Sequence, residues 1–512
     1  MLSRIHSTIL QGIDATSCEV EVDISRGSLG SEGLSLVGLP DAAVKESISR
    51  VQAAMRNSGY RWPGPKVTIN LAPADVRKEG PSYDLPIALG AMLASGELDG
   101  RKHGQFLILG ELALDGRLRP VRGALAAALL ARREGLRGVL LPSPNAREAA
   151  VVDGIEVIGA DTLAQAVGFL SEELPLEATA VDLQAVFEEA QRYDIDFADV
   201  RGQSAAKRAM TVAAAGHHNL LMIGPPGSGK TMLAQRLVTI LPALTPDESL
   251  ETTRIYSARG LLPPGQSLMA TRPVRTPHHS ASAASLIGGG AMPQPGEVSL
   301  AHHGVLFLDE FPEFPRATLE MIRQPLEDGH VTIPRVHSTL RFPARMMLVA
   351  AMNPCPCGYA TDPKRKCNCT PNAIARYMGR VSGPLIDRID IHIEVPAVSF
   401  GALRRAASDG MTSQQMRDAV LAARRAQRER FGPNATTTNA SMASRQVRTY
   451  CKLDPAGETL LKMAMTEMGL SARAHDKVLR VARTIADLDG QADIAAAHLA
   501  EAIQYRRLDR QA

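Results

Sequence analysis

The chain has 512 residues, of which 45% are hydrophobic and 22% are charged. These proportions are typical of globular proteins and exclude a disordered chain. The length exceeds what one hydrophobic core can serve, so we expect about three domains. The formal net charge of +3 excludes a protein that is strongly basic or acidic throughout. The N-terminal segment lacks the apolar core of a signal peptide, and no apolar run approaches the ~20 residues of a membrane helix, so we expect a cytoplasmic protein that does not enter a membrane.

The first 170 residues alternate between strand-like and helix-like patterns, which predicts a first domain of mixed strands and helices. The patterns predict strands at 66–73 and 105–114 and helices at 42–59 and 122–135. The segment 171–195 is acidic and weakly patterned, which indicates a linker.

A second α/β region spans residues 196–398, and residues 399–512 are helical in pattern and rich in Ala and Arg. Residues 401–512 hold 18 lysines and arginines against 12 acidic residues. This asymmetry is compatible with a nucleic-acid partner and equally with a solvated basic helix.

The strongest functional signal is the stretch NLLMIGPPGSGKTML at 219–233. An apolar strand precedes a glycine-rich loop and a helix-forming run follows it, which is the context of a phosphate-binding loop. Backbone N–H groups of such a loop wrap the phosphates, and the helix N-terminus favours their negative charge. Lys230 would reach the β- and γ-phosphates of ATP, and Thr231 would supply a hydroxyl to Mg²⁺. The predicted nucleotide-binding residues are Gly224, Pro225, Pro226, Gly227, Ser228, Gly229, Lys230 and Thr231.

Two further apolar strands end in polar side chains. The strand GVLFLDE at 304–310 ends in Asp309 and Glu310, and RMMLVAAMN at 345–353 ends in Asn353. Asp309 would hold Mg²⁺ through water, and Glu310 would polarise the attacking water. Asn353 would orient that water. An acidic pair at a strand end is also common as solvated surface, but its spacing from the glycine-rich loop fits the second half of an NTPase site.

Four of the six cysteines lie between residues 352 and 369 as two C-x-C pairs. In a reducing compartment such clusters are more often metal ligands or redox centres than disulfides. Four thiolates would hold one tetrahedral Zn²⁺, and the spacer is long enough to fold the second pair back. Unliganded thiols and a redox pair remain alternatives, although thiol exchange typically uses C-x-x-C. The predicted zinc ligands are Cys355, Cys357, Cys367 and Cys369.

The glycine-rich loop, the two strands with polar ends and the stretch GPLIDRIDIHIEV at 383–395 together resemble AAA+ ATPases of the magnesium-chelatase-like branch. The resemblance implies an α/β P-loop core with a parallel sheet and a helical lid, entered through an adenine-pocket segment at 196–210. It also implies an arginine just after the last core strand, matched by Arg388, that reaches the γ-phosphate of a neighbouring subunit. The lid arginine matches Arg473. Both roles imply a homo-oligomeric ring, a hexamer; pairing of Arg388 with Asp387 or Asp390 is the alternative.

Two insertions that are typical of this branch also have matching segments in this chain. Residues 271–300 match an extra loop that faces the centre of the ring, and we favour packing or positioning roles over metal ligation for His278 and His279. Residues 327–347 read as a hairpin. Its tip holds Arg335 and His337, which would contact a DNA backbone in the pore or be merely solvated.

Residues 1–170 resemble the proteolytic domain of Lon, which shares the fold of ribosomal protein S5. The matching stretches are KEGPSYDLPIAL at 78–89 and the segment 109–142, and Ser82 falls at the position of the nucleophile. The partner lysine should lie within 122–131, where the chain has none. A serine without its base is a weak nucleophile, so we expect an inactive scaffold or a nucleic-acid platform.

The order of parts from end to end resembles the ComM/YifB group of bacterial ATPases. That resemblance implies an ATP-driven hexameric motor acting on branched or single-stranded DNA, a branch-migration helicase of recombination and natural transformation. A chelatase-type motor and a protein-remodelling ATPase without DNA are the alternatives.

Overall fold

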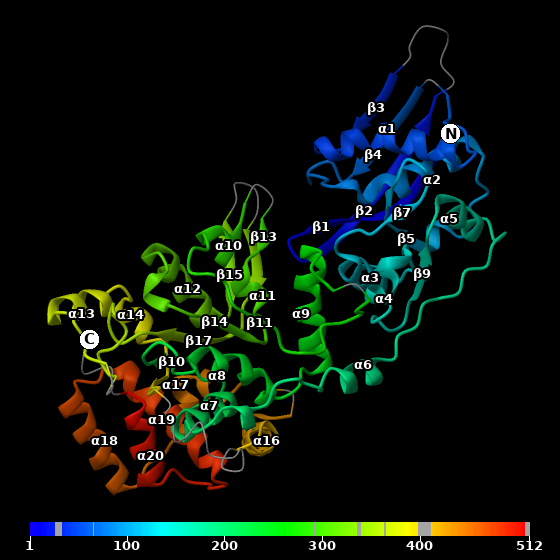
Figure 1. Ribbon diagram of the computed structural model, residues 1–512. Coiled ribbons are helices and arrows are strands. Elements are labelled where there is room, and N and C mark those ends of the chain that lie inside the picture. Colours follow the sequence, from blue (N-terminus) through cyan, green and yellow to red (C-terminus); the bar gives the residue numbers. More distant parts are fainter. Residues whose placement is uncertain are drawn as a thin grey trace. The chain divides into compact units, whose positions relative to one another are not determined.

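A computed structural model describes the chain in two compact units, each treated by itself (Figure 1). The described residues are 1–25, 33–64, 66–263, 265–290, 293–334, 339–362, 365–397, 411–433 and 435–506. The N-terminal unit comprises residues 1–189 and 246–270, and the C-terminal unit comprises residues 190–245 and 271–512. The segment 246–270, which lies between two stretches of the predicted ATPase core, thus packs in the N-terminal unit.

The N-terminal unit is built around a four-stranded sheet. Its strands, in sheet order, are β1 (Leu2–Gln11), β2 (Asp14–Ile24), β4 (Lys66–Ala72) and β3 (Gly33–Val37). Along β2, the buried Cys18, Val20 and Val22 alternate with acidic residues that are partly exposed, because successive strand side chains point to opposite faces. The helices α1 (Ala42–Asn57) and α2 (Asp84–Ser95) share this core.

The same unit holds a parallel sheet of three short strands. These are β5 (Phe106–Ile108), β8 (Gly138–Pro142) and β9 (Glu156–Ala160), and the helices around them are α3 (Ala124–Arg133), α4 (Ser143–Ala149), α5 (Leu163–Leu170) and α9 (Pro246–Arg259). The predicted strand at 66–73 and the helices at 42–59 and 122–135 are confirmed. The strand predicted at 105–114 is divided into β5 and β6 (Glu111–Leu112), and β6 pairs with β7 (Leu118–Arg119). The predicted linker contains the short helix α6 (Leu183–Glu189).

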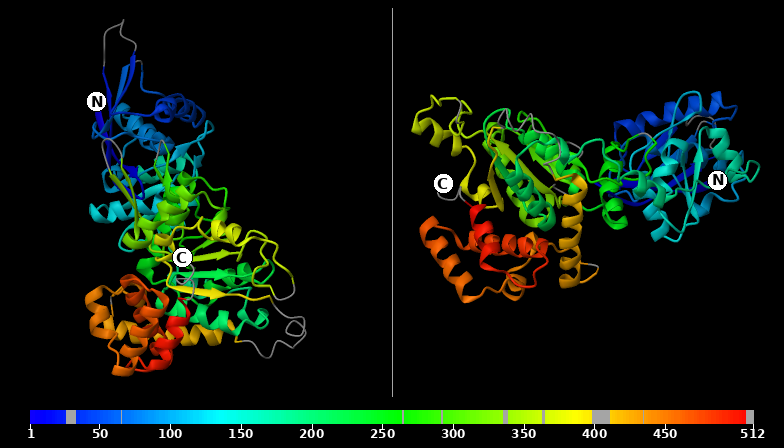
Figure 2. Two further views of the ribbon diagram at one scale, coloured as in Figure 1. Left: turned by 90° about the vertical axis from the view of Figure 1, so that its left-hand side faces the viewer. Right: turned by 60° about the horizontal axis from the view of Figure 1, so that its bottom comes forward.

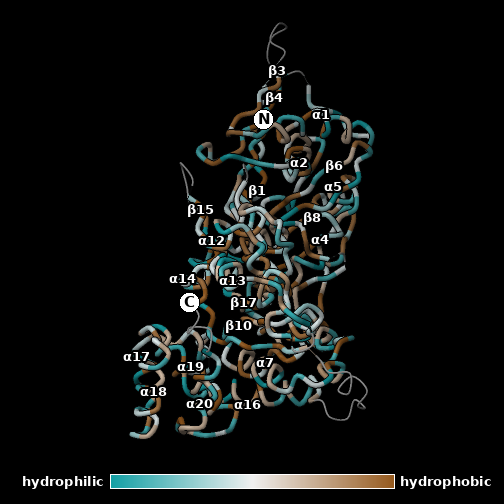
Figure 3. The backbone as a smooth tube through the Cα atoms, turned by 60° about the vertical axis from the view of Figure 1, so that its left-hand side comes forward, coloured by the Kyte–Doolittle hydropathy of each residue, from teal (hydrophilic) through white to brown (hydrophobic). Residues whose placement is uncertain are grey.

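The C-terminal unit contains a five-stranded sheet in which every pair of neighbours is parallel. In sheet order the strands are β11 (Val274–Arg275), β14 (Val305–Leu308), β17 (Met347–Met352), β10 (Leu220–Ile223) and β18 (Ile391–Glu394). The residues of β10, β14 and β17 are all buried, and Figure 3 shows brown, apolar stretches at the labelled strands β10 and β17. Continuous apolar runs are expected where helices cover both faces of a parallel sheet. The predicted α/β core with a parallel sheet is confirmed.

A group of helices follows the sheet and forms the predicted lid. They are α16 (Ser413–Phe431), α17 (Ser444–Tyr450), α18 (Pro455–Met468), α19 (Ala472–Leu488) and α20 (Ala496–Gln504), drawn in gold to red in Figure 2. α16 and α19 pack against α7 (Ser204–Gly216), and one hydrophobic core runs from the strands into these helices. A buried ion pair joins the two parts, since Lys477 Nζ lies 2.6 Å from Asp390 Oδ1.

The predicted hairpin at 327–347 is present as β15 (His330–Pro334) and β16 (Thr339–Pro343), which pair antiparallel after α12 (Arg316–Asp328). Its tip residues Arg335 and His337 lie outside the described residues. The 271–300 insert forms α10 (Ala283–Ile287), the small hairpin of β12 (Gly288–Gly289) and β13 (Gln294–Pro295), and α11 (Glu297–Leu300). Within the described part of the chain, no helix is both long and apolar enough to cross a bilayer.

Candidate functional site

The phosphate-binding loop connects β10 to α8 (Lys230–Arg236). Two of its glycines are required by the geometry. A Cβ on Gly224 would lie 2.1 Å from the Val395 carbonyl oxygen, and Gly229 has a φ of +92° directly before the helix. Glycine has no side chain, so it fits the close approach at position 224 and adopts the left-handed conformation at position 229 at little cost. The loop therefore has the backbone form that its sequence predicts.

Lys230 is buried inside this loop. Its Nζ donates to the carbonyl oxygens of Gly224 at 2.7 Å and Pro225 at 3.0 Å, and to Asn353 Oδ1 at 3.3 Å. Burial lowers the pKa of Lys230, and the nearby Asp309 opposes this change. The ammonium thus lies at the centre of the loop, within reach of an anion that the loop would hold.

The carboxylates of Asp309 and Glu310 follow β14. They lie at the same edge of the sheet as the phosphate-binding loop, because β10 and β14 are both parallel to β17. Asp309 Oδ2 accepts a hydrogen bond of 2.7 Å from Thr231 Oγ1, the hydroxyl predicted to bind Mg²⁺. Asp309 Oδ1 accepts the backbone N–H of Glu310 at 2.9 Å. Hydroxyl and carboxylate oxygens are the ligands that Mg²⁺ prefers, so the two side chains fit a magnesium site.

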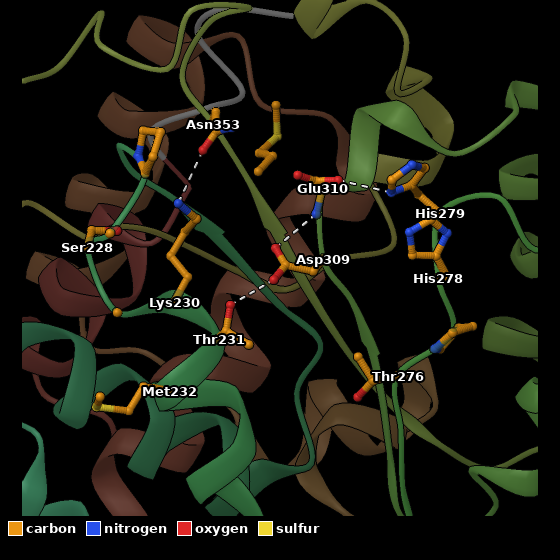
Figure 4. Close-up of a pocket in the computed structure, with 15 residues that line it drawn as sticks. Ser228, Lys230, Thr231, Met232, Thr276, His278, His279, Asp309, Glu310 and Asn353 are labelled. Atoms are coloured by element: carbon orange, nitrogen blue, oxygen red, sulfur yellow. Dashed lines mark hydrogen bonds and ion pairs between the residues drawn. The ribbon is translucent and has the colours of Figure 1, made fainter.

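A cavity of about 630 Å³ lies among these residues (Figure 4). It is lined by Pro226, Gly227, Ser228, Gly229, Lys230, Thr231, Met232, Thr276, Pro277, His278, His279, Asp309, Glu310, Met352 and Asn353. The structure therefore brings together most of the predicted loop with the predicted carboxylates and amide. Thr276 to His279 were not among the predicted site residues, since no sequence motif places the start of the insert at this edge.

The predicted adenine-pocket segment 196–210 is tied to the phosphate-binding loop by Gln203. Its Nε2 donates to the carbonyl oxygens of Ser228 at 3.3 Å and Pro396 at 2.7 Å. Later in the segment, the buried Lys207 donates its Nζ back to the Phe197 carbonyl at 2.9 Å. The Gln203 contact holds the entry segment against the loop and the Lys207 contact closes the segment on itself. The sequence carried no signal for either of them.

Neither of the two predicted arginines lines the cavity within the described part of the chain. Arg473 is exposed in the first turn of α19. Arg388 lies between α14 (Gly383–Ile386) and β18, before the last strand of the sheet, so the expected position after that strand is wrong. Its Nη2 lies 2.5 Å from Glu327 Oε1, and its Nη1 donates to the Pro384 carbonyl at 2.6 Å.

The expected alternative pairing of Arg388 is also wrong. Asp390 pairs with Lys477, and the carboxylate of Asp387 lies 3.9 Å from Arg506. The partner of Arg388 is Glu327, at the end of α12, far away in sequence. Glu327 is half exposed, whereas the Arg388 side chain is mostly buried.

The four clustered cysteines come together in space. Their sulfur atoms all lie within 4.8 Å of one another, with Cys355 to Cys357 at 3.3 Å and each of these to Cys367 at 3.6 Å. Sulfurs bound to one zinc ion at about 2.3 Å in a tetrahedron would be about 3.8 Å apart. The set therefore fits a tetrahedral metal site.

This cysteine loop touches the phosphate-binding loop. Gly358, between the two cysteine pairs, has a φ of +86°, and a Cβ there would lie 2.7 Å from Pro226 Cδ. The Gly358 N–H donates to the Cys355 carbonyl at 2.9 Å. A change in the fold of the cysteine loop would therefore reach Pro226 directly.

The Lon-like serine has no catalytic lysine at the expected place in the structure. The expected lysine position lies in α3, where Leu125 and its neighbours are buried in an apolar core. Lys78, four residues before Ser82, is fully buried and donates its Nζ to the Pro73 carbonyl. Burial lowers the pKa of Lys78, but its amine is engaged with backbone.

Comparison with family models identifies three matching segments. Residues 20–145 match the model described as subunit ChlI of Mg-chelatase, residues 196–403 match that of magnesium chelatase, subunit ChlI, and residues 410–506 match the C-terminal model of the same subunit. Together these segments cover most of both units.

Similar proteins extend over nearly the full length. The chain is 44% identical over 513 residues to competence protein ComM of Haemophilus influenzae, and 43% identical over 512 residues to YifB of Escherichia coli; each match covers 99% of this chain and 98% of the relative. A match of 117 residues, 32% identical, links 22% of this chain to 14% of Lon protease 4 of Sorangium cellulosum.

We expect Glu310→Gln to bind ATP as the unchanged protein does and to lose turnover by roughly 10²- to 10⁴-fold, because an amide cannot accept the proton of the attacking water. The matched control is Glu313→Gln. Glu313 lies in the turn that follows Glu310, and its half-exposed carboxylate pairs with Arg380. Binding is measured with a fluorescent ATP analogue and turnover by phosphate release. Normal hydrolysis in Glu310→Gln would remove Glu310 from this role.

Proposed function

Because the chain belongs to the ComM/YifB group of magnesium-chelatase-like AAA+ ATPases, we propose that it is an ATP-driven motor that acts on DNA as a branch-migration helicase. The observation that supports ATP turnover most directly is the meeting of Lys230, Thr231, Asp309, Glu310 and Asn353 at one sheet edge. DNA as the substrate is supported by the full-length similarity to a protein named for competence.

The site residues divide the work of hydrolysis. Thr231 and Asp309 would hold the Mg²⁺ that accompanies ATP, and this ion neutralises charge on the phosphates. Lys230 binds the β- and γ-phosphates. Glu310 accepts a proton from the attacking water, and Asn353 orients that water. Each role requires a side chain that lines the cavity, and all five of these residues line it.

Arg388 would complete the site of the neighbouring subunit in a ring of identical chains, a hexamer. Within its own chain it lies outside the cavity lining and is paired with the half-exposed Glu327. Arginine is suited to bind the phosphate in the neighbouring subunit because its side chain is always charged and donates hydrogen bonds in a planar fork. Hydrolysis would then require two adjacent subunits, which couples the ring to each turnover.

The cysteine cluster would hold one structural Zn²⁺. Its sulfur spacing fits tetrahedral coordination, and a zinc ion would stabilise all four sulfurs as thiolates. The contact between Gly358 and Pro226 means that the ion would support the shape of the phosphate-binding loop.

We expect DNA with a fork or a four-way junction to increase the ATPase rate several-fold over the rate without DNA, because the motor would hydrolyse ATP productively only on its track. Linear duplex DNA, unfolded polypeptide and porphyrin serve as the comparison ligands in the same phosphate-release measurement. Stimulation by polypeptide or porphyrin alone would replace the DNA motor with a remodelling ATPase or a chelatase-type motor.

Mixing two inactive variants tests the shared site. Arg388→Ala and Lys230→Ala should each lose at least about 10³-fold in turnover. A mixture should regain activity at the interfaces where an intact Lys230 meets an intact Arg388. The control is a mixture of Lys230→Ala with Glu310→Gln, in which both changes fall on the same side of the interface. No recovery at any mixing ratio would contradict the shared site.

We expect one zinc per chain in the purified protein, measured by elemental analysis. The double variant Cys367→Ser with Cys369→Ser should lose the metal and bind ATP more weakly, since the loop against Pro226 loses its support. Cys451→Ala, which changes a buried cysteine of the lid, should keep its zinc. Well under one zinc per chain in the unchanged protein would leave the cysteines as free thiols.

A further inference from the structure

The two residues that follow Arg388 are both bonded to the lid. Arg506, which lies after α20, donates its Nη1 to the Ile389 carbonyl at 2.6 Å. Lys477 of α19 places its Nζ 2.6 Å from Asp390 Oδ1. The short segment between α14 and β18 therefore belongs to the core by sequence but is in direct contact with the lid.

The carboxylate of Asp390 joins the lid to the core. Its Oδ1 meets Lys477, and its Oδ2 accepts the N–H of Asn219, directly before β10, at 3.0 Å. The Asn219 side chain in turn donates its Nδ2 to the Arg388 carbonyl at 3.1 Å. The Lys477 and Asp390 side chains are only 13% and 9% exposed, so water screens their attraction little. One buried ion pair thus connects a lid helix to the backbone around Arg388.

Lys477 lies on the helix that begins with the predicted lid arginine. Arg473 is exposed in the first turn of α19. Lys477 follows four residues later on the same side of the helix, about 6 Å along its axis. The rest of α19 packs against α7 and α16, so the helix moves as a rod. Arg473 and Arg388 are therefore linked through one helical turn and one ion pair.

The chemistry of the Lys477–Asp390 contact favours alignment over stabilisation. Taking two charges out of water costs free energy, and the attraction between them roughly offsets that cost. Apolar side chains of similar volume would hold the lid to the core as well. An ion pair differs from apolar packing because its nitrogen and oxygen must meet at hydrogen-bond distance. It therefore fixes the position of α19 relative to the segment of Arg388.

Such alignment matters for an arginine that must reach another subunit. The Arg388 side chain contacts Glu327 and the Pro384 carbonyl, both in the core. Its starting point is the backbone that Asn219 and the lid hold. A displacement of about 1 Å in a catalytic group can cost roughly 10²-fold in rate. A contact that places this backbone can thus control turnover without touching the nucleotide.

We propose that Lys477 is a positioning residue of ATP hydrolysis. Its ion pair with Asp390 fastens the segment of Arg388 to the lid, so that Arg388 enters the neighbouring site together with the lid of its own subunit. The inference rests on the proposed function, because it takes Arg388 as the arginine that completes the neighbouring site. It adds the contact that positions this arginine.

Mixing variants shows on which side of the interface Lys477 acts. Lys477→Met keeps the length of the side chain and removes its charge; turnover should fall by about 10- to 100-fold, with the KM for ATP within about twofold of the unchanged protein. Mixed with Lys230→Ala, it should regain activity, because some interfaces then combine an intact Lys230 with an intact Lys477 and Arg388. Mixed with Arg388→Ala, it should not, because neither chain then positions a working arginine.

The reverse pattern, or no recovery in either mixture, would overturn the proposal. The mixture of Arg388→Ala with Lys230→Ala runs alongside. If that mixture also fails to recover, the shared site itself is wrong. If it recovers and Lys477→Met with Lys230→Ala does not, only the positioning role is wrong.

A double variant separates positioning from stability. Lys477→Met alone leaves the buried Asp390 without its partner and should lower the melting temperature. Lys477→Met with Asp390→Asn removes both charges and should unfold closer to the unchanged protein, while its turnover stays low. Turnover that returns together with stability would overturn the proposal. The control is Glu501→Gln, which changes another ion pair between lid and core, 3.0 Å from Arg208, and should keep its turnover.

Discussion

The parallel pairing of β10 with β17 and β18 is the constraint on which the site depends. Ile223 lies opposite Met352, and Leu308 lies opposite Ala350, so the chain leaves these strands at one edge. Parallel strands require long connections. The connections between these strands contain the insert, the hairpin and the cysteine loop. The insert and the chain after β17 both start at this edge, where the cavity forms, and residues 276–279 and Asn353 line it. A substitution that shifted one strand would therefore disturb the phosphate-binding loop, the carboxylates and Asn353 together.

The segment that carries Arg388 is held from the lid as well as from the core. Lys477 of α19 pairs with the buried Asp390, and Arg506 donates to the carbonyl of the residue after Arg388. Asn219 donates to the Arg388 carbonyl from the start of β10. Burial alone would raise the pKa of Asp390, but the charge of Lys477 and a hydrogen bond from His218 keep it below its usual range. A movement of the lid would thus be transmitted to the backbone of Arg388, whose side chain contacts Glu327 and the Pro384 carbonyl of the core.

Local patterns were sufficient for much of this protein. The glycine-rich loop between an apolar strand and a helix requires a particular backbone form, and the structure has it, with Lys230 buried at its centre. The strand that ends in Asp309 and Glu310 and the antiparallel hairpin at 327–347 follow from residue order and alternation, which act over a few residues. The cysteine spacing likewise predicted a cluster, and the sulfurs do come together. In each case the chemistry lies in neighbouring residues, so no knowledge of distant parts is needed.

Contacts between distant segments could not be read in this way. The pairing of Arg388 with Glu327, the approach of Gly358 to Pro226 and the contact of His279 with Glu310 all depend on which strands are neighbours in the sheet. The assignment of residues 246–270 to the N-terminal unit depends on where their apolar side chains find a core. A sequence states which groups are available, but distances across a sheet or a loop arise only when the whole chain is packed. For this reason most residues that line the cavity could be predicted from motifs, while their contacts with distant segments became visible only in the fold.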